Sequence, residues 1–141
     1  MKFKFAYIFV MLLALCFSKT TLAQADKVDA QRVSFITEKV KLTTAEAQSF
    51  WPLYNEYNDK VKALRKNFRT NYGKKEDFSS DKEAGDYLNA ELNLKQSEVD
   101  LKKEYTEKFK KVLGTKKTAL LRKAEEEFLR ILINTAKGNG P

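Results

Sequence analysis

The residue types that most often carry chemistry in proteins are nearly absent from this chain. It contains no histidine, and its single cysteine, Cys16, and both methionines, Met1 and Met11, lie near the N-terminus. Beyond that segment no nucleophile can be paired with a histidine or a cysteine. The thiolate, thioether and imidazole ligands that zinc, copper and nickel prefer are also missing there. We therefore expect no metal site of this kind.

The remaining acidic residues do not form a convergent site. Glu125, Glu126 and Glu127 are consecutive, so on a helix their carboxylates point in different directions. The glycines at 73, 85 and 114 are isolated, which excludes a glycine-rich phosphate loop. No stretch has the spaced Asp/Asn/Gly pattern of a calcium loop. We expect a protein that is not an enzyme and that has no catalytic residues, no bound metal and no cofactor.

The N-terminal segment has the pattern of a secretory signal peptide. Lys2 and Lys4 precede the uncharged apolar run Phe5–Phe17, and small residues then allow cleavage after Ala23 or after Ala25. The run is shorter than the roughly 20 residues of a membrane-spanning helix, although a retained anchor is an alternative. We predict a signal peptide over 1–23, a helical domain over 24–136 and a disordered tail over 137–141, in a protein exported to the periplasm.

Cys16 is the only candidate for lipid attachment or a disulfide. The residue before it is Leu15, where a lipoprotein signal has a small residue, which disfavours lipid attachment. Cleavage after Ala23 leaves a mature chain without cysteine and therefore without a disulfide framework.

The chain is basic, and its charges are mixed in sign. The formal net charge is +8, and removal of the first 23 residues leaves about +5. A nucleic-acid partner is one interpretation of such an excess. Export and the interleaving of signs, as in Lys102-Lys103-Glu104, instead favour a solvated helical face. We expect no nucleic-acid binding, and only weak attraction to anionic surfaces or acidic polypeptides.

Helical periodicity runs through the mature chain, and strand patterns are missing. The apolar spacing, the isolated glycines and the cap residues predict helices over 26–41, 44–72, 81–113 and 115–136. Ser80 or Asp81 would cap the third helix and Thr115 the fourth. The fold class is all-α: an elongated four-helix protein made of two helical hairpins.

The start of the second helix carries the strongest local signal. Thr43-Thr44-Ala45-Glu46 is a capping box, in which the Thr43 hydroxyl and the Glu46 carboxylate each accept from the other residue's amide. Pro52 lies further along the helix and should bend it. Most aromatic side chains of this helix fall on one stripe and predict core, while Trp51 lies off it and could line a groove. We assign a structural motif to Leu42, Thr43, Glu46, Phe50, Pro52 and Tyr54.

The third helix has more apolar surface than one packing seam needs, spread over about 200° in two adjacent rows. One row is Tyr87, Ala90, Leu94, Leu101, Tyr105, Phe109 and Val112, and the other is Leu88, Leu92, Val99 and Leu113. Part of this surface should stay exposed for a second subunit or a ligand. The candidate surface for a client or partner consists of Trp51, Tyr87, Leu88, Leu92, Val99 and Tyr105. Ion pairs along the helix are expected at Glu98–Lys102, Glu104–Lys108 and Glu107–Lys111.

The stretch from Leu42 to Tyr57 resembles the first signature of the Spy/CpxP-like periplasmic proteins, the LTxxQ-motif group. It is most similar to a variant common in Bacteroidetes that is often labelled a sensor of an ECF-type sigma factor. Residues 112–133 are similar to the second signature. The chain departs from the pattern in two places: Glu46 replaces the glutamine that names the motif, and Leu113-Gly114-Thr115 replaces the second Leu-Thr.

The resemblance implies a cradle-shaped, four-helix homodimer in the periplasm. Spy-like members are ATP-independent chaperones that hold unfolding clients, and CpxP-like members bind the sensor domain of an envelope-stress kinase. Metal-sensing relatives use histidine and methionine ligands, which the mature chain lacks.

The first functional hypothesis is accordingly an envelope-stress protein that holds unfolded or partly folded polypeptides without ATP. The alternative is a regulatory adaptor or sensor that binds a membrane signalling partner of an envelope-stress or sigma-factor system. A purely structural helical protein is a third possibility.

Overall fold

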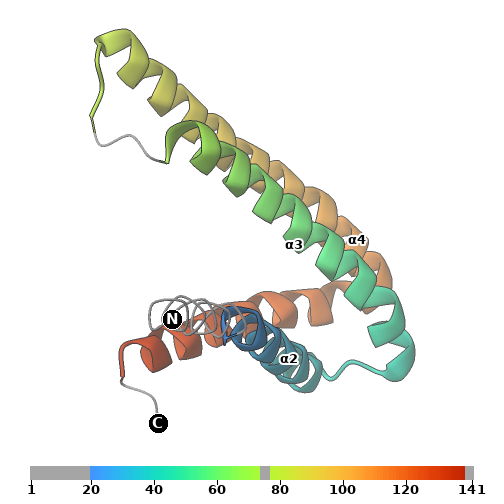
Figure 1. The fold of residues 1–141 in the computed structure, drawn as a ribbon. Helices are drawn as coiled ribbons and strands as arrows, with labels where there is room; N and C mark the ends of the chain where they lie inside the picture. The colour runs from blue at the N-terminus through green and yellow to red at the C-terminus, as the bar shows by residue number, and fades with distance from the viewer. Residues whose placement is uncertain (1–19, 74–76, 139–141) are drawn as a thin grey trace, which may run out of the picture. The chain divides into compact units, whose positions relative to one another are not determined.

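The chain is mostly helical in the part that the structure describes. The computed structural model describes residues 20–73 and 77–138, and side chains from Lys27 onward. In these residues there are three helices and no strand: α2 (Thr20–Val40), α3 (Thr44–Tyr72) and α4 (Asp81–Ala136). Figure 1 shows their order along the chain. The all-α prediction is confirmed.

Helix α3 begins where the capping box predicts. The Thr43 amide donates to Glu46 Oε2 over 2.8 Å, and the Glu46 amide donates to Thr43 Oγ1 over 3.2 Å. Both amides would otherwise lack a partner at the start of a helix. Pro52 lies inside α3 and cannot donate a backbone hydrogen bond. The start of α3 therefore coincides with a local sequence signal.

Helix α4 begins with similar capping hydrogen bonds. The Ser80 hydroxyl accepts from the Glu83 amide over 3.3 Å, and the Glu83 carboxylate accepts from the Ser79 amide over 2.7 Å. Of the two caps that the sequence allows, Ser80 is the one that the structure uses, and Asp81 is the first helical residue.

The sequence predicts four helices, and the structure assigns three, because α4 merges two helices across a kink at Gly114. Helix α4 is 56 residues long and continues across Gly114, the residue expected to separate two helices. Its backbone at Gly114 is nevertheless not helical, with φ 77° and ψ 164°. Thr115 directly follows this kink, where the second of the two merged helices starts. The position of the break was correctly predicted, but the assigned helix spans it.

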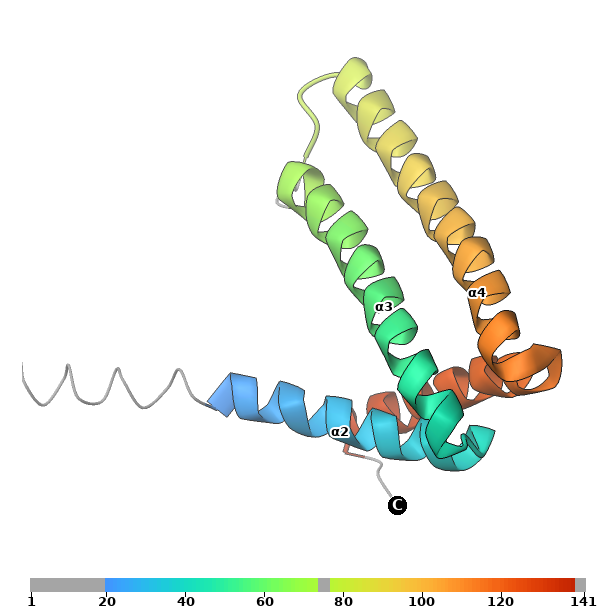
Figure 2. The same cartoon turned by 90° about the vertical axis from the view of Figure 1, so that its right-hand side faces the viewer.

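The helices form two units. The hairpin unit is Leu42–Arg122, which contains α3 and the larger part of α4. The terminal unit contains α2 and the part of α4 that starts at Lys123. In the hairpin unit, α3 and α4 run antiparallel, as Figures 1 and 2 show. Contacts between Phe50 and Phe109 at one end and between Phe68 and Tyr87 at the other confirm this direction.

The core of the hairpin unit is aromatic and lies at one end. Phe50 and Tyr54 of α3 pack against Phe109 of α4, with ring centroids 5.4 and 6.3 Å from it. The chain beyond Gly114 returns to the same place, because Arg122 donates to the Thr106 hydroxyl over 3.0 Å. Sixteen residues of straight helix would separate these positions by about 24 Å, so the Gly114 backbone turns the chain. The buried side chains here are Phe50, Tyr54, Tyr105, Phe109, Leu113, Thr118 and Leu121.

The terminal unit has a smaller core built from α2 and the end of α4. Phe35 and Phe128 lie 5.6 Å apart between ring centroids, and Lys39 pairs with Glu127 over 2.8 Å. Ile36, Val40, Ala124 and Phe128 are buried. The exposed ion pair adds little stability, so the apolar contacts stabilise this unit.

The predicted signal peptide and the predicted tail lie only partly within the described residues. Helix α2 starts at Thr20, ahead of the predicted start at Asp26, and so includes the proposed cleavage position after Ala23. The first 19 residues of the predicted signal peptide and residues 139–141 of the predicted tail lie outside the described residues. Lys137 and Gly138 form a turn after α4.

Candidate functional site

The motif at the start of α3 is a structural element. Glu46 closes the capping box and also accepts from Lys117 Nζ over 2.6 Å, which joins α3 to the part of α4 after Gly114. The hydrogen bond from Lys117 and then that from the Thr43 amide lower the pKa of Glu46. Leu42 is half-buried, and Phe50 and Tyr54 belong to the core. These groups hold helices together and leave no open polar site.

Trp51 belongs to the same aromatic cluster. Its ring stands edge-on to Phe50 and Tyr54, with centroids 4.9 and 5.4 Å away. The side chain is half-buried. Trp51 therefore packs against the core of the hairpin unit and is only partly exposed to solvent.

Three predicted surface residues are exposed along one side of α4, and we call them the outward row. Leu88, Leu92 and Val99 have 56, 67 and 46 % of their area exposed. They recur at helical spacing, so they follow one stripe. Large apolar side chains exposed singly are common, but a row on one helix face indicates a contact surface. Leu113, which the sequence places in the same row, is buried, because α4 at that point lies in the core.

Tyr105 is not a surface residue, and its assignment to the candidate surface is wrong. It is fully buried, with its ring 5.4 Å from that of Tyr57 and 6.1 Å from that of Phe109. Lys108 Nζ lies 4.2 Å from the Tyr105 ring centroid and covers another side. The buried Tyr105 hydroxyl and then Glu56 raise the pKa of Lys60. Helical spacing alone cannot say which of two adjacent apolar rows faces the partner helix.

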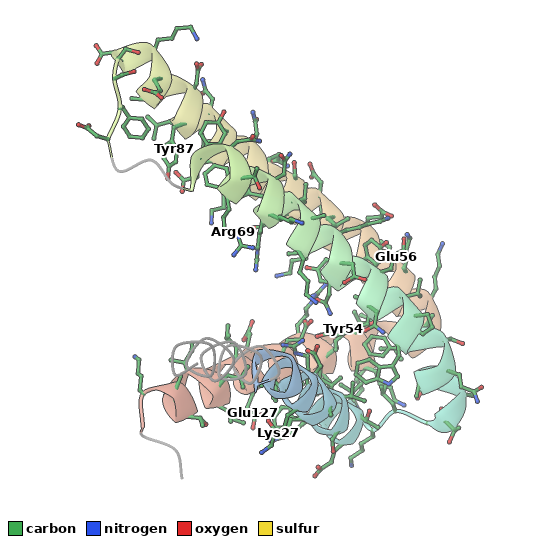
Figure 3. All side chains as sticks on the ribbon, viewed as in Figure 1. Lys27, Tyr54, Glu56, Arg69, Tyr87 and Glu127 are labelled. Carbon is green, nitrogen blue, oxygen red and sulfur yellow. The ribbon has the colours of Figure 1, made fainter. Side chains whose placement is uncertain are left out.

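Tyr87 is less exposed than the outward row and less buried than Tyr105. It is half-buried in an aromatic cluster at the far end of the hairpin unit, where its ring lies within 6 Å of those of Phe68, Tyr72 and Phe78. Figure 3 labels Tyr87 near this end and Tyr54 near the other. Tyr87 therefore contributes more to joining α3, the connecting segment and α4 than to an open surface.

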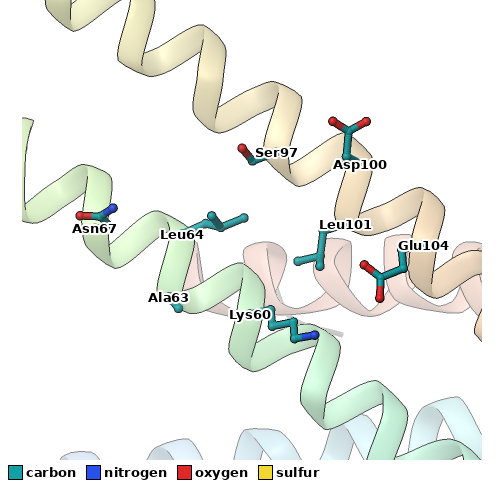
Figure 4. Close-up of a pocket in the computed structure, with 8 residues that line it drawn as sticks. All are labelled: Lys60, Ala63, Leu64, Asn67, Ser97, Asp100, Leu101 and Glu104. Atoms are coloured by element: carbon teal, nitrogen blue, oxygen red, sulfur yellow. The ribbon is translucent and has the colours of Figure 1, made fainter.

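An open groove between α3 and α4 was not predicted from the sequence. It has a volume of about 650 Å³ and is lined by Lys60, Ala63, Leu64, Asn67, Ser97, Asp100, Leu101 and Glu104. Figure 4 shows these residues arising from the two facing helices. The sequence does hold one indication of it. Asn67 and Asn71 are four residues apart, as are Asn93 and Ser97, so each pair places uncharged polar side chains on one face of its helix. The alignment of the two helices, which brings these pairs together, is a tertiary property.

The charges near these surfaces are largely paired within the chain. Glu104 pairs with Lys108 over 2.7 Å, as predicted, whereas Glu98 pairs with Arg65 of α3 and Glu107 pairs with Lys110. Lys95, Lys102 and Lys103 are exposed on α4 beside the outward row. Lys103 lies 3.5 Å from Asp100, so the charge near the row is basic at Lys95 and Lys102 and partly balanced at Lys103.

No metal cluster or membrane span emerges from the described residues. Over 20–73 and 77–138, no group of three or more acidic, histidine or cysteine side chains is placed to hold a metal ion. In the same ranges no helix is both long and apolar enough to cross a membrane.

Comparisons with known proteins give no further assignment. No family model, no curated protein and no solved structure matches this chain.

Proposed function

We propose that the mature chain is an exported, Spy/CpxP-like protein of the periplasm that binds unfolded or partly folded polypeptides without ATP. The outward row carries this proposal: Leu88, Leu92 and Val99 keep about half or more of their area in solvent on one face of α4. The capping box at Thr43 and the burial of Phe50 and Tyr54 are compatible with the structural role that the sequence predicts for this motif.

The physics of this surface suits an unfolded client. Burial of apolar side chains gives non-directional attraction of roughly 25 cal/mol per Å², so it does not require one sequence. The neighbouring Lys95, Lys102 and Lys103 would speed the approach of acidic segments without fixing their geometry. A weak, sequence-tolerant contact of this kind binds and releases clients without an energy source.

An aggregation assay tests the proposal. The chain from Gln24 is mixed with several unrelated proteins during thermal or chemical unfolding, and light scattering is followed. We expect suppression for most clients and its loss in Leu88→Ser/Leu92→Ser/Val99→Ser. The matched control is Val33→Ser/Leu129→Ser/Ile133→Ser, which removes three apolar residues of similar exposure from the terminal unit. Equal activity of the two triple variants, or no suppression by the unchanged chain, would refute the proposal.

A regulatory adaptor is the second candidate, and the small size of the outward row favours it. Three side chains on one helix can serve a single folded partner as well as many unfolded ones. Suppression restricted to one client would support the adaptor and count against the chaperone.

The same row could also join two copies of the chain in a homodimer through α4. Sedimentation of the unchanged chain and of the outward-row variant distinguishes the two uses. A dimer that the variant converts to a monomer would assign the row to self-association, and a monomer at all concentrations would exclude the dimer.

A further inference from the structure

The groove between α3 and α4 continues along the hairpin unit. A second hollow of about 250 Å³ shares Leu64, Asn67 and Ser97 with the first. It extends the groove toward Tyr72 on α3 and Ala90 on α4. From Lys60 to Tyr72 the helix rises about 18 Å at 1.5 Å per residue. The two hollows therefore form one groove of about that length.

The lining of the groove combines an apolar floor with uncharged polar groups. Ala63, Leu64, Leu94 and Leu101 supply aliphatic surface. The uncharged polar lining includes three asparagines and one serine, namely Asn67, Asn71, Asn93 and Ser97. A carboxamide both donates and accepts hydrogen bonds, as a peptide group does.

Much of this hydrogen-bonding capacity is free. Asn71 Nδ2 donates to Asn67 Oδ1 over 2.9 Å, which leaves the Asn67 donors and the Asn71 carbonyl available. In the part of the chain that the structure describes, the side chains of Asn93 and Ser97 have no protein partner. All four residues are exposed. The groove can therefore offer donors and acceptors from both walls.

The charged residues at one end are already neutralised by neighbours. Lys60 pairs with Glu56 over 3.0 Å, and Glu104 pairs with Lys108 over 2.7 Å. Asp100 accepts from Gln96 over 2.9 Å and lies 3.5 Å from Lys103. The groove thus presents dipoles rather than net charge, and its electrostatic complement is an uncharged polar chain.

We infer that this groove binds an extended segment of polypeptide, of about five residues at 3.3 Å each. The asparagines and Ser97 bind its peptide groups, and the aliphatic floor takes its apolar side chains. An unfolded chain has unpaired N–H and C=O groups to offer, whereas a helix has already paired its own. The inference rests on the proposed function and names the part of an unfolded client that is recognised.

The groove and the outward row are separate surfaces of α4. At 100° per residue, Ser97 lies about 180° around the helix from Leu88. Variants of one surface therefore leave the other unchanged, and the two contributions can be measured independently.

The test uses the chain from Gln24 and a fluorescein-labelled, acetylated and amidated hexapeptide of Val, Leu and Ser, followed by fluorescence anisotropy. Asn67→Ala/Asn93→Ala removes one carboxamide from each wall. The matched control, Asn55→Ala/Asn89→Ala, removes one exposed asparagine from each of the same helices outside the groove. Circular dichroism checks that both variants keep their helix content.

We expect the groove variant to raise the Kd about tenfold, equivalent to about 1.4 kcal/mol, and the control to change it by less than about twofold. A hexapeptide N-methylated on alternate residues should bind the unchanged chain as weakly as the unmodified peptide binds the groove variant. Its Kd should not rise further in that variant, since both changes remove the same hydrogen bonds. Added salt should have little effect on the Kd.

Other results would overturn the inference. These are equal binding by the groove variant and the unchanged chain, full affinity for the N-methylated peptide, or tighter binding of a stapled helical peptide or a chito-oligosaccharide. The proposed function fails differently, namely if the unchanged chain does not suppress aggregation, even where it binds the peptide through Asn67 and Asn93. Aggregation suppression that depends on the outward row but not on Asn67 and Asn93 would refute the groove assignment alone.

Discussion

The two halves of the hairpin unit are built from the same pair of helices, yet only one half has a buried core. The base half, residues 50–57 of α3 with 105–122 of α4, contains all seven buried side chains of the unit. In the distal half, residues 60–72 with 87–104, every residue is half-buried or exposed. Both halves have apolar residues at helical spacing. The helical spacing of apolar residues therefore does not by itself determine which side chains are buried.

The difference comes from a third segment of chain. In the base half, the part of α4 after Gly114 returns along Thr106 and places Arg122 5.7 Å from the Tyr57 ring centroid and 5.9 Å from that of Phe109. The distal half has only two helices. Each helix covers part of the apolar stripe of the other, and the rest of each stripe stays in contact with solvent. A stable base half can thus carry a distal half that stays partly open for binding.

The largest expected effect removes a ring from the base half. Phe109→Ala should lower the free energy of unfolding by about 3–5 kcal/mol, because Phe109 is fully buried. Leu94→Ala in the distal half should cost only about 1 kcal/mol, because Leu94 is half-buried. Urea unfolding followed by circular dichroism measures both. Equal losses would show that the two halves have equivalent cores.

The next effect concerns Gly114, where the chain turns so that the following part of α4 packs on the base half. Gly114→Ala should cost about 1–3 kcal/mol, because φ 77° with ψ 164° is a region that almost only glycine adopts. The cost is conformational, since no atom lies within 4 Å of an added Cβ.

Gly85→Ala is the control in thermal unfolding. Gly85 lies within α4 with equally open space, so alanine there should stabilise the protein by about 0.5–1 kcal/mol. A neutral Gly114→Ala would mean that the turn needs no special backbone.

A smaller effect concerns the cap at the start of α3. Thr43→Ala should cost about 1 kcal/mol, because it leaves the Glu46 amide without its acceptor. Thr44→Ala, one residue later and exposed, should change stability by less than about 0.5 kcal/mol. Denaturant midpoints of the two variants that coincide would contradict the capping role.

The smallest effect is a change in pH dependence. The pKa of Glu46 is lowered in the folded protein, chiefly by Lys117, from an ordinary value of 4.5. The carboxylate therefore stabilises the fold above about pH 4.5, and this contribution disappears as the pH falls through the lower folded pKa. Glu46→Gln should flatten the acid side of the stability profile measured by urea unfolding at several pH values. An unchanged slope would show that the Lys117 contact is not formed in solution.

The features that were predictable from sequence are those encoded within a few residues. The capping box, the end of α3 near Gly73 and the unusual backbone at Gly114 each depend on local chemistry. The outward row was also predictable as apolar surface in excess of one seam, since three of the four residues in the predicted second row of α4 are exposed and only Leu113 is buried.

The remaining features depend on how distant segments align. Glu98 was expected to pair along α4 with Lys102, but Arg65 of α3 lies opposite and takes its place. Tyr105 is buried because Tyr57 and Phe109 surround it, which no helical wheel of α4 can show. The groove requires Asn67 of α3 and Ser97 of α4 to lie opposite each other. The sequence of either helix alone does not predict how far one helix is shifted along the other.

The single tryptophan of the chain, Trp51, packs on Phe50 and Tyr54 in the base half, while the far end of the distal half carries Tyr72 and Tyr87. Its emission therefore reports on one half of the molecule only. A melting curve recorded at tryptophan wavelengths would stay flat while the tyrosine end opened. Because Tyr54, Tyr57 and Tyr105 also lie in the base half, tyrosine emission reports on both halves, and a loss of helix content that precedes the change in Trp51 emission would reveal opening of the distal half.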